Sequence, residues 1–129
     1  MKLNASTLRI YAACAYEVAG AALRIGRRAP AIDRLLLGAG ARDAVLMTAC
    51  NPLGRRKPPG WNSRMMARLR EAVRHRITFP GESGSGPWRE AQILVLCAPA
   101  WGVRIARQFR QNAVLLLRRG QPPRLAACG

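Results

Sequence analysis

The chain has 129 residues, half of them hydrophobic, so it can bury the core of one domain and is not a disordered basic tail. Its formal net charge of +16, from 22 Lys and Arg against 6 Asp and Glu, favours nucleic acid, another polyanion or an acidic protein as a partner. Nearly all the basic residues are arginines, in a chain also rich in Ala, Gly and Pro, and a GC-rich genome produces this composition without any selection for binding.

Short apolar segments dominate the first part of the chain. Residues 1–15 are expected to form a short helix or to be loosely ordered. In residues 16–26, β-branched and aromatic side chains flank Gly20, which predicts two short strands around a turn. Residues 30–41 place apolar side chains at helical spacing after a proline and before glycines, which predicts a short helix. Residues 44–49 are a continuous apolar run, the pattern of a central strand.

A basic helix comes next. Residues 62–76 combine an apolar stripe with arginines on the other faces, which predicts an amphipathic helix. Residues 77–80 predict a brief strand, and the Gly/Ser-rich segment 81–88 is expected to be a flexible loop that does not match a phosphate-binding motif. Residues 91–98 predict a second central strand.

The last part of the chain completes a single α/β domain. Residues 100–112 predict a helix, residues 113–117 a strand and residues 123–128 a last edge strand. The order β-β-α-β-α-β-β-α-β-β, without a repeat or a linker, favours a mixed β-sheet with about three helices packed on it. We expect one domain over residues 1–129, with its core at about 16–128. An α+β arrangement is the alternative.

The cysteines and the single histidine do not suggest a metal site. Cys14, Cys50, Cys97 and Cys128 lie far apart in the sequence, and His75 alone cannot complete a zinc cluster. Charged residues interrupt the N-terminal apolar segment, and the longest apolar run is too short to span a bilayer. We therefore expect no metal, no cofactor, no membrane span and a cytoplasmic location.

Polar side chains follow the apolar strand at 44–49. In α/β proteins, ligands bind beyond the carboxyl ends of strands, where loops and helix N-termini meet, and Thr48 and Asn51 lie at such an end. Each polar residue also has a simpler explanation: Asn51 before Pro52 favours a turn, and Asn62 can act as a helix N-cap. The basic residues of the same region are candidates for anion contacts: Arg55, Arg56, Arg64 and Arg68.

Three further polar residues stand at the edges of expected elements. Glu90 precedes a central strand and is a candidate acid–base residue, with an exposed salt bridge as the alternative. Gln111 and Asn112 end a helix, where Asn112 can take the left-handed conformation. We expect Thr48, Asn51, Glu90 and Gln111 to lie within side-chain reach of one another, because each stands at the edge of an expected strand or helix. The candidate ligand-binding residues are Thr48, Asn51, Asn62, Glu90, Gln111 and Asn112.

The ordered motifs resemble a bacterial family called domain of unknown function 3293. The resemblance runs from about residue 16 to residue 128 and rests on "YEV", "LRIG", "TACNP" at 48–52, Asn62, "PGESG", Trp88, Glu90 and "FRQNA" at 109–113. It implies a compact α/β domain and the polar set named above, but no activity. The chain departs from the family pattern at Arg110, where a glycine is usual, and at Gln92, where a serine is common.

Three functions are compatible with these features. The first is a binding module whose polar cleft at the strand ends takes an anionic ligand or a nucleic-acid backbone, with weak, sequence-independent binding of nucleic acid. The second is a small hydrolase or transferase with Glu90 as acid–base residue, oriented by neighbouring amides. The third is an interaction protein for an acidic partner. A cleft that gathers the polar residues favours a small-ligand site or an enzyme, whereas a flat arginine face favours a polyanion.

Overall fold

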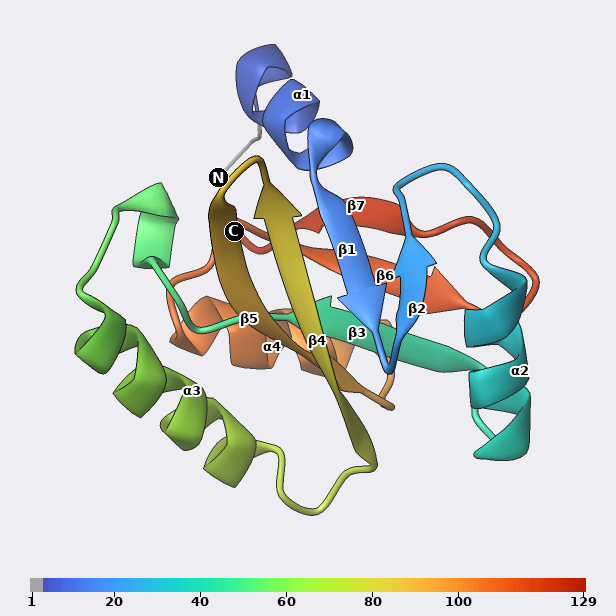
Figure 1. Cartoon of the computed structure of the whole chain (residues 1–129). Coiled ribbons are helices and arrows are strands. Elements are labelled where there is room, and N and C mark those ends of the chain that lie inside the picture. The colour runs from blue at the N-terminus through green and yellow to red at the C-terminus, as the bar shows by residue number, and fades with distance from the viewer. Residues whose placement is uncertain (1–3) are drawn as a thin grey trace.

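The computed structural model describes residues 4–129, which form four α-helices, a short 3-10 turn and seven strands (Figure 1). In chain order the elements are α1 (Ala5–Ala13), β1 (Ala15–Val18), β2 (Ala21–Leu23), α2 (Pro30–Gly38), β3 (Asp43–Met47), η1 (Pro52–Gly54), α3 (Pro59–Ala72), β4 (Thr78–Ser85), β5 (Trp88–Val95), α4 (Pro99–Gln108), β6 (Ala113–Arg118) and β7 (Arg124–Ala127). Residues 1–3, which belong to the segment expected to be helical or loosely ordered, lie outside the described residues.

The seven strands form one curled sheet with the order β2-β1-β4-β5-β3-β6-β7, and each neighbouring pair is antiparallel (Figure 1). The predicted α/β class, a sheet with helices packed on it, is confirmed, with four helices rather than about three. The sheet was expected to be mixed, but β3 lies between β5 and β6. These two strands run parallel to each other and are joined by α4, but they do not pair, so the sheet is antiparallel in its pairing.

β3 lies at the centre of the core because its side chains pack on both faces of the sheet. Val45 and Met47 belong to a hydrophobic cluster that includes residues of α3 and α4. Ala44 and Leu46 belong to a second cluster, which includes residues of α2. A Cβ atom added to Gly102 of α4 would lie 2.5 Å from Cγ2 of Val45, so only glycine permits this close helix–strand approach. Burial on both faces explains the continuous apolar run.

Segment 81–88 is not the flexible loop that its composition suggests. Most of it continues β4, which pairs with β5 along its full length in a β-hairpin. A Cβ atom added to Gly81 would lie 2.8 Å from the carbonyl oxygen of Glu17 in β1, so this glycine permits close packing of strands rather than mobility. The hairpin places Ser83 of β4 opposite Glu90 of β5.

Helix α1 stands at one end of the sheet (Figure 1), and none of its side chains is fully buried. The Asn4 side chain caps it by accepting a hydrogen bond from the Thr7 backbone N–H at 2.8 Å. The Tyr16 hydroxyl donates to the Tyr11 carbonyl at 3.3 Å, while Ile10 stays 66% exposed. No helix within residues 4–129 is long and apolar enough to cross a membrane.

Candidate functional site

The structure brings together most of the polar residues that the sequence singled out. Thr48, Asn51, Glu90, Gln111 and Asn112 all line one cavity of about 380 Å³, although they come from three separate parts of the chain. A second cavity, of about 490 Å³, lies on the α3 side and is lined by Asn62 together with Asn51 and Glu90. We call them the apolar cavity and the basic cavity, after the side chains described below. They share four lining residues: Cys50, Asn51, Trp88 and Glu90.

Asn51 is the centre of the hydrogen-bond network between the two cavities. It has a left-handed backbone conformation, with φ of +47°, and begins the turn η1, so the expected turn is present. Its side-chain Nδ2 donates to Oε2 of Glu90 at 2.8 Å. Its Oδ1 accepts from the backbone N–H of Lys57 at 2.9 Å and from Nδ2 of Asn62 at 3.0 Å. These contacts fix the direction in which the Asn51 amide points at Glu90.

Asn62 is not the helix N-cap that its position in the sequence suggests. Helix α3 begins at Pro59, about one turn earlier, because proline is well suited to the first position of a helix. The side chain of Asn62 is therefore free to reach back to Asn51. Its Oδ1 accepts from the Asn51 backbone N–H at 3.0 Å, and its Nδ2 also donates to the Lys57 carbonyl at 3.4 Å. Asn62 supports Asn51 and reaches Glu90 only through it.

Glu90 is a half-buried carboxyl group held by two amides. Besides Asn51, Nε2 of Gln92 donates to its Oε1 at 3.3 Å and also to the Ser83 hydroxyl at 3.0 Å. Among the described residues Glu90 forms no salt bridge, so the structure does not show the exposed ion pair considered as an alternative. Burial raises the pKa of Glu90 above its ordinary value near 4.5, and the hydrogen bond from Asn51 opposes this rise.

The Thr48 hydroxyl and Nε2 of Gln111 hold the backbone around the cavity. The Thr48 hydroxyl donates to the Ala91 carbonyl at 2.7 Å and accepts from the Cys50 backbone N–H at 3.0 Å. Nε2 of Gln111 donates to the carbonyls of Cys50 and Phe109 at 3.1 and 3.3 Å. Both residues fix the loop after β3 in place.

Asn112 differs from these residues because Oδ1 of its amide is buried and has no hydrogen-bond partner among the described residues. The left-handed position at this helix end is Arg110, with φ of +56°, rather than Asn112 as considered from the sequence. The carbonyl of Arg110 accepts from the Leu53 backbone N–H at 2.8 Å, which links the end of α4 to η1. A left-handed backbone explains why a glycine suits this position.

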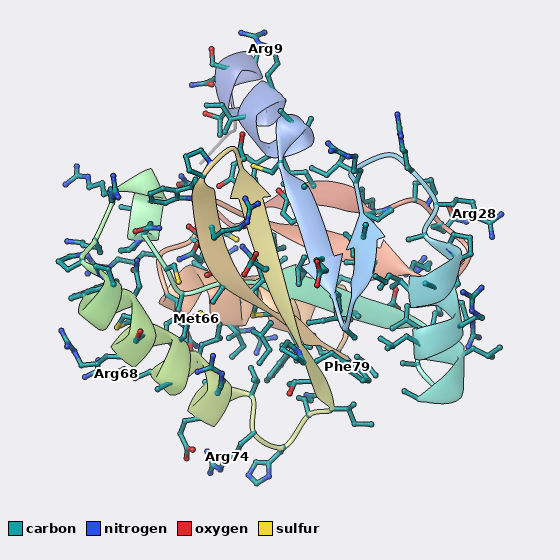
Figure 2. All side chains as sticks on the ribbon, viewed as in Figure 1. Arg9, Arg28, Met66, Arg68, Arg74 and Phe79 are labelled. Atoms are coloured by element: carbon teal, nitrogen blue, oxygen red, sulfur yellow. The ribbon has the colours of Figure 1, made fainter. Side chains whose placement is uncertain are left out.

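The basic cavity contains only one of the four arginines expected to contact an anion. Arg56 lines it, but Arg55, Arg64 and Arg68 line neither this cavity nor the apolar cavity. Figure 2 shows Arg68 projecting from α3 away from the sheet, whereas Met66 points toward the sheet. The cavity's other cationic side chains were not identified from the sequence: Lys57, Arg70 and Arg89.

Helical spacing could have identified Arg70. The α3 residues that line the basic cavity lie on one helix face, at spacings of three or four residues: Pro59, Asn62, Ser63, Met66 and Arg70. Once Asn62 is assigned to the site, this periodicity favours Arg70 over Arg64 and Arg68. Lys57 and Arg89 lie outside α3, and no periodicity points to them.

Aromatic rings accompany the cationic groups of the basic cavity. The guanidinium of Arg56 lies 5.0 Å from the ring centroid of Trp88, and the Lys57 ammonium lies 5.3 Å from that of Trp61. Arg89 pairs with Glu82 at 3.3 Å. Within residues 4–129, the other three cationic groups of this cavity have no acidic partner, so they are available to a ligand.

The cysteines near the site are not activated. Cys50 lines both cavities, but burial raises its pKa, so its thiol stays protonated at neutral pH. Burial and the nearby Glu90 likewise raise the pKa of Cys14, which lines the apolar cavity. The part of the chain described by the structure contains no group of three or more His, Cys, Asp or Glu side chains that could hold a metal ion.

Comparison with known proteins identifies a family for the region that builds the site. A sequence model of the family described as "Protein of unknown function (DUF3293)" matches residues 47–114, more than half of the chain. The match runs from the end of β3 into β6 and contains the six predicted polar residues and the four cationic residues of the basic cavity. No curated protein and no solved structure matches the chain.

Proposed function

The chain belongs to the DUF3293 family, and we propose that it is a binding module for a small ligand that carries a phosphate or another anionic group. One observation carries this proposal. Arg56, Lys57 and Arg70 line a cavity of about 490 Å³ and, among the described residues, have no acidic partner. Small-molecule binding sites are typically cavities of this size in which a few polar groups converge.

The position of these cations favours a small ligand over a nucleic-acid backbone. Arg55, Arg64 and Arg68 are exposed and lie outside these cavities. They would therefore attract a polyanion through dispersed surface charge and do not form one binding site. Exposed ion pairs contribute little individually, whereas a phosphate within a cavity can accept several charge-assisted hydrogen bonds at once. We expect any binding of nucleic acid to be weak and salt-sensitive, and to involve the exposed arginines rather than the basic cavity.

An acid–base role for Glu90 is a second candidate function, favoured by its raised pKa at the wall shared by two cavities. If Glu90 is a general acid, hydrolysis of p-nitrophenyl phosphates or esters should decline as the pH rises through its pKa. Glu90→Gln should abolish that hydrolysis and Glu71→Gln should not. No turnover of either substrate class, or equal turnover by both variants, would rule out this role for these substrates.

The binding proposal is tested by titrating inorganic phosphate and pyrophosphate into the protein at constant ionic strength. Arg70→Gln should weaken binding by about tenfold, because a charge-assisted hydrogen bond contributes about 1.5–3 kcal/mol. Arg68→Gln is the matched control: it removes the same charge from the same helix, outside the cavities. Equal losses in the two variants would show that phosphate responds only to net charge, and the proposal would be wrong.

A further inference from the structure

The apolar cavity is mostly hydrophobic and contains aromatic residues. It lies beside the basic cavity. Its hydrophobic and aromatic lining includes residues from α1, β1, β3, β5, β6 and β7, among them Ile10, Tyr11, Tyr16, Leu46, Trp88, Leu115 and Leu125. Its volume of about 380 Å³ lies within the range of small-molecule sites and can hold an aromatic ring system. The charges of the basic cavity do not explain this space, because none of its cationic side chains lines the apolar cavity.

Glu90 presents hydrogen-bond acceptors to this cavity. Oε2 accepts one hydrogen bond from Asn51, and Oε1 accepts one from Gln92. A carboxylate oxygen can accept two hydrogen bonds, so each oxygen keeps one site for a ligand. The two oxygens of one carboxylate can together accept from a ligand with two adjacent N–H groups.

Asn112 adds an independent requirement for a donor. Asn112 lines the apolar cavity. Its Oδ1 is buried and has no hydrogen-bond partner among the described residues. Burial raises the Tyr11 pKa, and an interaction with the Asn112 side chain opposes this rise. A buried carbonyl oxygen without a partner costs about 1–3 kcal/mol, so a ligand that donates to it gains affinity.

We propose that the apolar cavity takes a flat ring with two adjacent N–H donors, as in guanine, whose donors bind the Glu90 carboxylate while a further N–H reaches Asn112. An aryl amidine offers the same donor pair. A net charge of +16 disfavours that cation and favours a neutral base attached to an anionic group. The ligand class is therefore a guanine nucleotide, with its base in the apolar cavity and its phosphate in the basic cavity. The phosphate half rests on the proposed function, whereas the base half stands on the apolar cavity alone.

The shared wall allows one ligand to occupy both cavities. Asn51, Trp88 and Glu90 line both, so a base that contacts Glu90 from one side leaves its phosphate next to the cations on the other. Trp88 is 38% exposed and lies against Arg56, so it stands where the linings of the two cavities meet.

Guanosine and inosine, two neutral nucleosides, test the base half without any phosphate. Inosine lacks the exocyclic amine, so the unaltered protein should bind guanosine about tenfold more tightly by calorimetry. Glu90→Gln, which replaces one acceptor oxygen by a donor, should remove this preference. Glu71→Gln, an exposed carboxylate on α3, should keep it. No guanosine binding, equal binding of inosine, or a preference that persists in Glu90→Gln would overturn the base proposal.

Two further titrations separate the possible failures. Benzamidine carries the adjacent donor pair on an aryl amidine; if it binds through Glu90 while guanosine does not, the nucleobase assignment is wrong and the cavity is specific for amidines. If guanosine binds as expected but phosphate does not, the proposed function of the basic cavity is wrong and the base site stands. The comparison of nucleosides in the unaltered protein does not depend on any variant folding.

Discussion

The two cavities that meet at Glu90 differ in how their side chains are held. In the apolar cavity some polar groups, such as the Thr48 hydroxyl and Nε2 of Gln111, are already bonded to backbone carbonyls, and others, such as those of Asn51 and Gln92, to the Glu90 carboxylate. In the basic cavity the three arginines are exposed and Lys57 is partly buried, and three of these four cations lack acidic partners among the described residues. The polar groups of the apolar cavity are thus held in place before a ligand binds, whereas the basic cavity offers positive charge. We expect specificity from the first and electrostatic affinity from the second.

The largest expected effect concerns the residue on which both cavities depend. Asn51→Ala removes three side-chain hydrogen bonds and leaves a non-glycine residue in the left-handed region. We expect a loss of about 3 kcal/mol in the free energy of unfolding, measured by chemical denaturation. The exposed control Gln121→Ala should change it by less than about 0.5 kcal/mol. Similar values for the two variants would show that the network does not hold the shared wall.

A second variant separates the cavities by their ligands. Tyr11 lines only the apolar cavity, so Tyr11→Ala should weaken guanosine binding by about tenfold, within the range for loss of an aromatic contact to a base. Phosphate binding should not change. Leu8→Ala alters the same helix at a residue outside the cavities and should affect neither ligand. Loss of phosphate affinity in Tyr11→Ala would contradict the separation of the two cavities.

The third prediction concerns the strained residue whose carbonyl holds η1 next to the shared wall. Arg110 is exposed and has φ of +56°, so Arg110→Gly should stabilise the protein by about 1 kcal/mol, because glycine adopts this conformation without the steric cost. Arg104→Gly, in the interior of α4, should destabilise by about 1 kcal/mol. Thermal and chemical unfolding should show a higher free energy of unfolding for Arg110→Gly and a lower one for Arg104→Gly. Destabilisation by Arg110→Gly would contradict the strain argument.

The smallest expected effect is the pH dependence contributed by Glu90. Burial raises its pKa in the folded state above the value of about 4.5 in the unfolded chain, so the folded state binds more protons between the two values. Its contribution therefore favours folding at low pH and is lost as the pH rises from about 4.5 through the raised pKa. Denaturation midpoints of the unaltered protein minus those of Glu90→Gln should fall over this window. A difference that rises with pH would show that the pKa is lowered instead.

The sequence predicted the elements of the sheet better than the details of the site. The apolar run of β3 and the polar residues after it led to a correct expectation that Asn51 and Glu90 lie together. Composition misled at 81–88, because glycines that permit close strand packing look like loop glycines in a sequence. Asn62 was misassigned since the start of α3 depends on a proline pair rather than on a polar cap.

The hydrogen-bond network could not be inferred from the sequence. It depends on the left-handed conformation of Asn51 and on the register that sets Ser83 opposite Glu90. Both are consequences of tertiary packing, and neither has a distinctive local pattern. Which arginines line the basic cavity depends on which face of α3 packs against the hairpin of β4 and β5. Helical spacing can therefore identify the arginines that line the cavity only after one residue of that face is known.

The most direct test of the account compares guanosine 5′-monophosphate with guanosine in the unaltered protein, Arg70→Gln and Arg68→Gln, by calorimetry at constant salt. If one ligand occupies both cavities across Glu90, the nucleotide should bind the unaltered protein about tenfold more tightly than the nucleoside. That advantage should disappear in Arg70→Gln and persist in Arg68→Gln, while guanosine affinity stays the same in all three. A nucleotide that binds no more tightly than its nucleoside, or an advantage lost equally in both variants, would contradict the account.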